Sequence, residues 1–198
     1  MDKETKKPSD MNEADLPDVR AFNDEFTRDF LQSTEETKEG FYPFLSGTGK
    51  YKMDFPAEGV IGEKAYTKKK RGYEEFLIHI KDETGSIIRI NYYPGDRKES
   101  KDQSLDLLKG RLGYDGEFEK KEEDGQSLYY TDFERRGFHT YGGYVQNEQA
   151  DGGIDISYKI DCRDDKQDIC EANKETIAKK VMKWMKSVQL IHEEGEDE

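Results

Sequence analysis

The two cysteines of this 198-residue chain are the side chains best placed for covalent chemistry. Cys162 ends a stretch of alternating apolar and polar residues that begins at Ile154, so its side chain is expected on the apolar face of a strand. Cys170 opens an amphipathic pattern, which places it on the apolar face of a helix. Because both cysteines then face the same interface, we predict a Cys162–Cys170 disulfide. The bridge would close a nine-residue loop, and the chain-entropy relation gives it a contribution of about 2.5 kcal/mol.

Other reactive side chains in the sequence match no catalytic or metal-binding motif. The three histidines, His79, His139 and His192, have no metal-ligand spacing to one another or to a cysteine. A metal site shared by His79 and His139 would need ligands from separate strands to converge, and it is kept as an alternative. Carboxylates are so abundant that two of them lying close together would not by itself indicate catalysis. We therefore expect no catalytic residue, no metal and no cofactor.

One group of residues has the composition of a recognition surface. Aromatic and cationic side chains gather on two neighbouring predicted strands, a mixture that is typical of protein interfaces. The alternative is cross-strand aromatic packing beneath a helix. The candidate surface consists of Tyr129, Phe133, Arg135, Arg136, His139, Tyr141 and Tyr144.

These side chains must be positioned by short alternating strands and amphipathic helices. Apolar residues at 76, 78 and 80 and at 88, 90 and 92 alternate on either side of a turn at Asp82–Gly85, which predicts a hairpin. Three spaced leucines predict a helix over Asp102–Leu112, ended by Gly113. Further hairpins are predicted to join 117–121 to 127–134, through Asp124 and Gly125, and 138–145 to the strand before Cys162.

The helix after Cys170 has the clearest pattern in the chain. Asp168 and Glu171 have the spacing of a capping box at its start. Trp184 is the only tryptophan, and we expect it to be buried against the sheet because it belongs to a continuous stripe. The stripe consists of Ile177, Val181, Trp184 and Val188.

This element order predicts an α+β domain: a mostly antiparallel sheet of hairpins covered by helices on both faces, in three layers. The last helix suits the face that carries Phe76. A helix predicted to begin near Pro17, with Phe22 on its apolar side, is expected to cover the opposite face, which carries Leu77.

Composition bounds the domain and its partners. A net charge of −13 disfavours nucleic acid or an anionic membrane as the main partner, and the basic run Lys68–Arg71 is interpreted as a solvated turn. No stretch approaches the roughly 20 apolar residues of a membrane span. We expect a disordered, tether-like leader over residues 1–18, a single monomeric domain over 19–191 and an acidic disordered tail over 192–198.

The order of elements, together with the segment Gly49–Pro56 (Gly-Lys-Tyr-Lys-Met-Asp-Phe-Pro) and a closing helix that ends at Ser187–Leu190, resembles the PsbP-like fold over about residues 47–191. That resemblance implies no single activity, because photosystem accessory proteins, a nuclear-transport regulator and many bacterial lipoproteins share the fold. The leader over Asp2–Asp10 is also similar to the tether that follows the lipidated cysteine of Gram-positive lipoproteins. Position 1 is Met, which fits a start codon in place of that cysteine and equally an ordinary cytosolic start.

The leading hypothesis is a non-enzymatic lipoprotein, anchored to the outer face of the cell membrane, that binds or assists an unidentified envelope protein or cell-wall component. Contact with the membrane is expected only through the lipid anchor. The predicted disulfide favours such an oxidising location. One alternative is a cell-envelope hydrolase with a site built from scattered carboxylates and His139. Another is a cytosolic regulatory module, which requires the cysteines to be reduced.

Overall fold

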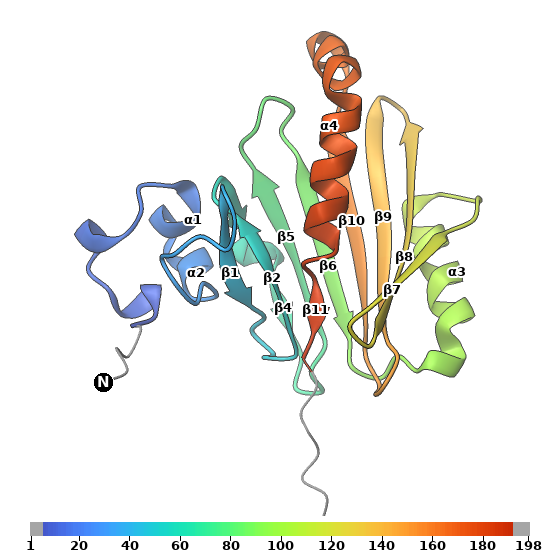
Figure 1. Cartoon of the computed structure of the whole chain (residues 1–198), viewed down its shortest axis with the longest axis horizontal. Coiled ribbons are helices and arrows are strands. Elements are labelled where there is room, and N and C mark those ends of the chain that lie inside the picture. The colour runs from blue at the N-terminus through green and yellow to red at the C-terminus, as the bar shows by residue number, and fades with distance from the viewer. Residues whose placement is uncertain (1–5, 192–198) are drawn as a thin grey trace, which may run out of the picture.

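Two antiparallel sheets organise the protein in a computed structural model that describes residues 6–191 (Figure 1). The larger sheet has eight strands in the order β3-β5-β6-β10-β9-β8-β7, with β4 paired to β5 outside this path, and the smaller has the order β1-β2-β11. The predicted α+β class with a mostly antiparallel sheet is therefore confirmed. The strands are β1 (Phe41–Leu45), β2 (Tyr51–Pro56), β3 (Gly59–Ile61), β4 (Thr67–Lys68), β5 (Glu74–Ile80), β6 (Ile87–Tyr93), β7 (Glu119–Glu123), β8 (Gln126–Arg135), β9 (Phe138–Asn147), β10 (Gly153–Asp161) and β11 (Gln189–Leu190).

Helices of very different length accompany the sheets. The two long helices lie on opposite faces of the large sheet, α4 across its middle and α3 near the β8 end (Figure 1). None of the described helices combines the length and the apolar content needed to cross a membrane. The α-helices are α1 (Arg20–Asn23), α2 (Glu25–Arg28), α3 (Lys101–Leu112) and α4 (Gln167–Met185), and short 3-10 helices cover Pro8–Asp10, Glu13–Asp15, Glu63–Ala65, Lys98–Ser100 and Asp164–Lys166.

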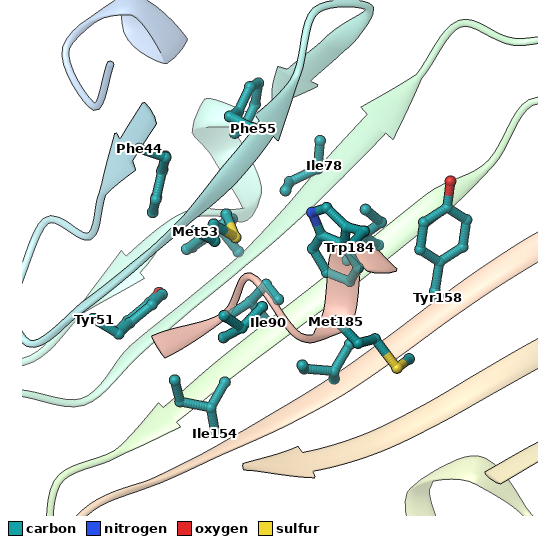
Figure 2. Close-up of a cluster of buried hydrophobic side chains, with 14 of the residues drawn as sticks. Phe44, Tyr51, Met53, Phe55, Ile78, Ile90, Ile154, Tyr158, Trp184 and Met185 are labelled. Carbon is teal, nitrogen blue, oxygen red and sulfur yellow. The ribbon is translucent and has the colours of Figure 1, made fainter. Parts of the chain in front are cut away.

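The main core lies between α4, the small sheet and one face of the large sheet (Figure 2). Trp184 is only 2% exposed, and its ring meets Tyr158 edge to face at 5.6 Å. The indole Nε1–H donates a hydrogen bond to the Asp54 carbonyl of β2 at 2.9 Å, which ties α4 to the small sheet. Tyr51 of the small sheet packs against Tyr92 of β6 at 5.5 Å between ring centres. The predicted burial of Trp184 is confirmed.

The sequence pattern predicts the disulfide correctly, but it does not predict the two ends of α4. Cys162 and Cys170 are bonded, which joins the end of β10 to the first turn of α4. The predicted capping box is absent: the N-cap position is Lys166, and its side chain makes no capping hydrogen bond. The 3-10 turn that precedes α4 moves the helix start ahead of Asp168, so this residue lies inside the helix. Val188 is buried but lies beyond the helix end.

The N-terminal helix prediction was wrong in length and in position. Asp24 ends α1 and caps α2, because its carboxylate accepts a hydrogen bond from the Thr27 amide at 2.8 Å. Phe22 packs against Tyr42 of β1 at 4.7 Å, within the core that α4 also covers. The face that carries Leu77 is therefore not covered by this segment. That face is instead partly covered by the other long helix, α3.

The described part of the predicted leader has structure. Pro8 is buried in a short 3-10 helix, Leu16 packs against the main core, and Arg28 of α2 lies 3.8 Å from the Glu13 carboxylate. The prediction that the leader is disordered as far as residue 18 was therefore wrong for residues 6–18, because Pro8 and Leu16 supply apolar contacts that the charge-rich composition conceals. Residues 1–5 and the predicted acidic tail over 192–198 lie outside the described residues.

Candidate binding groove beside α3

The seven residues predicted as one recognition surface are divided between the two faces of the large sheet. In the β8–β9 pair, Tyr129 lies opposite Tyr144 and Asp132 lies opposite Tyr141. Since neighbouring residues of a strand point to opposite faces, these two pairs face opposite ways. Tyr129, Phe133 and Tyr144 lie on the α3 face, whereas His139 and Tyr141 lie on the α4 face. Strand pairing does not bring the aromatic residues together as a single surface.

The aromatic residues on the α3 face serve packing. Tyr129 and Tyr144 are buried with two leucines of α3, and Phe133 stacks on Tyr114 at 4.9 Å between ring centres. The Tyr144 hydroxyl donates to the Asp96 carboxylate at 2.9 Å. Burial, and then the nearby Asp96 charge, raise the pKa of Tyr144. This cluster matches the alternative that the sequence left open, aromatic packing beneath a helix.

His139 is held between carboxylates on the other face. Its Nε2 lies 3.0 Å from Asp132, its Nδ1 lies 3.6 Å from Glu134, and its ring stacks on Tyr141 at 4.6 Å. Burial, followed by the charges of these two acids, raises the pKa of Tyr141 to about 12. His79, at an odd-numbered position of β5, points to the opposite face, so the two histidines do not meet. Within residues 6–191, no three His, Cys, Asp or Glu side chains are grouped to hold a metal ion.

Two adjacent glycines of β9 let a helix approach each face of the sheet. A Cβ at Gly142 would lie 2.4 Å from the Leu112 side chain of α3, and one at Gly143 would lie 3.4 Å from the Met185 sulfur of α4. The pairing of β8 with β9 is continuous through both positions, so these glycines do not mark a β-bulge. Gly142 therefore places the C-terminal end of α3 directly on the sheet and fixes one wall of an open hollow.

That hollow, which we call the α3 groove, consists of two adjoining depressions of about 450 Å³ and about 530 Å³. It exists because α3 covers β8 and β9 but leaves the neighbouring face of β5 and β6 open. Ile87, at 39% exposure, is one of the few large apolar residues left open to solvent. The lining of the groove includes Leu77, Ile87, Arg89, Asn91, Leu108, Arg111, Leu112, Phe133, Arg135, Arg136, Phe138, Asp155, Ser157, Lys159 and Asp161.

An ion pair fastens α3 to the floor of the groove. Asp155 of β10 has a side chain that is only 3% exposed, and its carboxylate pairs with Arg111 of α3. The Arg111 guanidinium also lies 5.6 Å from the ring of Tyr93. A buried carboxylate is costly unless a cation compensates it, so this contact holds the helix in place as well as neutralising the floor.

The groove has an excess of positive charge at one end. Its acidic residues are paired, Asp155 with Arg111, and Asp161 with Arg163 at 2.8 Å and with Lys166 at 3.3 Å. The Arg163 hydrogen bond, outweighing desolvation, lowers the pKa of Asp161. By contrast, three of the lining cations have no carboxylate partner among residues 6–191. They are Arg136, Lys159 and Arg135, and the last of these donates a hydrogen bond to the Gly113 carbonyl.

Sequence reasoning found part of this groove and missed the rest. Arg135 and Arg136 belonged to the candidate surface, but Lys159 and Asp155 were treated only as the polar side of a strand. Antiparallel pairing of β10 with β6 places Lys159 opposite Ile87. That pairing joins segments far apart in the chain, and no local pattern in the sequence specifies it. The available signal for these groove residues was the alternation of apolar and polar side chains, which assigns successive residues of each strand to opposite faces of the sheet.

The fold and groove define a small α+β domain with one closed and one partly open sheet face. The chain belongs to the family described as "Putative lipoprotein YvcA", which matches residues 17–189. It is similar to "Putative lipoprotein YvcA" of Bacillus subtilis (strain 168), with 26% identity over 207 residues that cover 98% of this chain and 86% of the relative. The predicted kinship with lipoproteins is confirmed, and the PsbP-like resemblance stays a prediction.

A crystal structure from Bacteroides thetaiotaomicron VPI-5482 is also similar, with a TM-score of 0.47 and 14% sequence identity. The superposition covers 80% of this chain and 51% of the solved one. The chain thus spans about half the length of that protein.

Proposed function

We propose that this protein is a non-enzymatic lipoprotein, tethered to the outer face of the cell membrane, that uses the α3 groove to bind or assist another component of the cell envelope. The observation that carries the proposal is the groove itself: an exposed hollow with apolar lining residues, and with cations that have no carboxylate partner in the described part of the chain, in a protein of net charge −13. Concave sites of a few hundred Å³ that combine apolar surface with a few polar groups are the usual form of binding sites.

Two further observations support the proposed location. The Cys162–Cys170 disulfide is of the kind that persists in oxidising compartments. The family description names a lipoprotein. In this proposal the lipid anchor is carried by the native precursor, and the domain works as a monomer.

The location is tested in cells that produce the native precursor. We expect the protein in the membrane fraction, accessible to protease once the wall is removed, and released into the medium when the lipidated residue is replaced. The gene should encode a signal peptide with a lipidation motif just before Asp2. Recovery from the cytosol with both cysteines reduced would contradict the proposal.

The role of the groove is tested by cross-linking in the same cells. A photoreactive residue at Ile87, which lines the groove, is compared with one at Leu107, an exposed leucine of α3 that does not line it. Both positions carry exposed aliphatic side chains, at 39% and 56% exposure, so general surface contact affects them alike. We expect adducts with an envelope component from position 87 only. Equal adducts from both positions would remove the groove from the proposal.

A further inference from the structure

The groove cations that have no carboxylate partner among residues 6–191 line the groove together with one aromatic side chain. Phe138 lines both depressions of the groove, and Arg135, Arg136 and Lys159 line the depression that it shares with them. Arg163, already paired with Asp161, lies 4.5 Å from the Phe138 ring centre. Like charges held together repel one another, and an anionic group at this position would relieve that repulsion.

Arg136 occupies a backbone position that disfavours its side chain. It forms the two-residue turn between β8 and β9 with Gly137, and the φ angles are 52° and 76°. The corresponding turn between β7 and β8 has nearly the same angles, 52° and 75°, but uses the favoured pair Asp124-Gly125. Asn or Asp would fit this positive φ better than Arg, so the arginine at this position is not explained by the turn itself.

The rest of the groove restricts what the anion can be attached to. Leu77, Ile87 and Leu108 provide apolar surface, so a ligand made only of sugar or polyol phosphates would leave that surface uncovered. Ser157, which is only partly buried, places a hydroxyl among them, and an acyl chain would bury that hydroxyl without a hydrogen-bond partner. A peptide offers apolar side chains, backbone hydrogen bonds and carboxylates together.

We infer that the α3 groove binds an acidic peptide segment of a partner protein, in which carboxylates alternate with apolar side chains. The carboxylates contact Lys159 through its ammonium charge and Arg135 and Arg136 through their guanidinium groups, which suit bidentate pairing with carboxylate. The apolar side chains cover Ile87 and its neighbours. This inference rests on the proposed function for the location of the partner, but it concerns the ligand chemistry alone.

The experiment measures binding of a fluorescein-labelled peptide of alternating Glu and Leu to the full chain by fluorescence anisotropy. The groove variant Lys159→Glu/Arg136→Glu is compared with Lys179→Glu/Lys180→Glu, an equal change of charge on exposed positions of α4. We expect the groove variant to weaken binding by about tenfold or more. The α4 control is expected to bind as the wild type does, and circular dichroism verifies that each variant is folded.

Two competitor ligands test the chemistry further. A peptide with Ser in place of Leu should bind more weakly than the alternating one, and glycerol phosphate polymer should compete poorly. If the polymer competes as well as the peptide, or if both double variants lose binding equally, the inference is overturned. If the peptide does not bind while position 87 still forms adducts in cells, the ligand class is wrong and the proposed function survives.

Arg136 offers a separate test that folding effects cannot imitate. Arg136→Asn places a favoured residue at the positive-φ position, so we expect an unchanged or higher melting temperature together with weaker peptide binding. A merely structural role for Arg136 predicts the opposite pairing, lower stability with unchanged affinity, and that result would overturn the inference.

Discussion

The two faces of the large sheet are built from the same strands but have different properties. On the α4 face, Ile78, Ile90 and Ile154 are fully buried in the core with Trp184 and the small sheet (Figure 2). On the α3 face, the same strands β6 and β10 carry the exposed Ile87 and the exposed cation Lys159. Burial of apolar area is the main source of stability, so most of it must come from the α4 face. The α3 face is only partly covered, and part of its surface stays exposed.

Helix length and position explain the difference. The 19 residues of α4 lie over the middle of the sheet, whereas the 12 residues of α3 lie near the β8 end (Figure 1). A side chain at Gly142 would meet α3 and one at Gly143 would meet α4. These two consecutive residues therefore allow a direct comparison of the two faces. A strand whose neighbours alternate between faces can therefore contribute to a closed core and to an open groove at once.

The largest expected effect is on the closed face. Trp184→Ala should lower the free energy of unfolding by about 3–5 kcal/mol, because it removes a buried indole and its hydrogen bond to Asp54. Lys183→Ala, one position away and exposed, should stay within about 0.5 kcal/mol. Urea unfolding followed by circular dichroism measures both. A small loss for Trp184→Ala would show that the α4 face does not carry the stability.

Loss of the disulfide should come next. Replacement of Cys162 and Cys170 by Ser is expected to cost about 2.5 kcal/mol from the entropy of the closed loop. The start of α4 should exchange its amide hydrogens faster, while α3 is unaffected. Titration of unfolded, unreduced protein from its natural compartment should detect no free thiol. Two titratable thiols there would refute the bridge.

Gly142 and Gly143 compare the faces within one strand. Gly142→Ala should cost about 1–3 kcal/mol, because its Cβ would lie 2.4 Å from the Leu112 side chain and push α3 outward. Gly143→Ala should change stability by less than about 1 kcal/mol, since its Cβ would meet Met185 at 3.4 Å. Thermal unfolding measures the loss of stability in both variants. Equal losses would show that α3 and α4 pack equally closely on the sheet.

The smallest effect should have the opposite sign. Arg136→Asn is expected to raise stability by about 0.5–1 kcal/mol, because it relieves an unfavourable residue at positive φ. Asp124→Arg, at the matching turn, should lower stability by a similar amount. Chemical denaturation measures the change in the free energy of unfolding for each of the two variants. Destabilisation by Arg136→Asn would mean that the arginine contributes to the fold.

Local patterns predicted much of the fold and little of the groove. Alternation identified the hairpin of β5 and β6, and Gly113, with φ at 65°, ended α3 as expected. The prediction of one N-terminal helix was wrong because the Asp24 side chain caps Thr27 and starts a second short helix. The short Arg136-Gly137 turn could have fixed the β8–β9 register and separated Tyr141 from Tyr144. The groove needed the distant pairing of β10 with β6 and the position of α3, which no short stretch of sequence encodes.

The most direct test of the division between the faces is a paired measurement of unfolding free energy and peptide affinity on two variants. Ile78→Val, on the α4 face, should lose about 0.5–1.5 kcal/mol of stability and keep wild-type affinity. Lys159→Glu/Arg136→Glu, in the groove, should keep its stability within about 0.5 kcal/mol and lose affinity by about tenfold. If Ile78→Val weakens binding, or if the groove variant loses stability and keeps its affinity, the two faces do not have the separate roles described here.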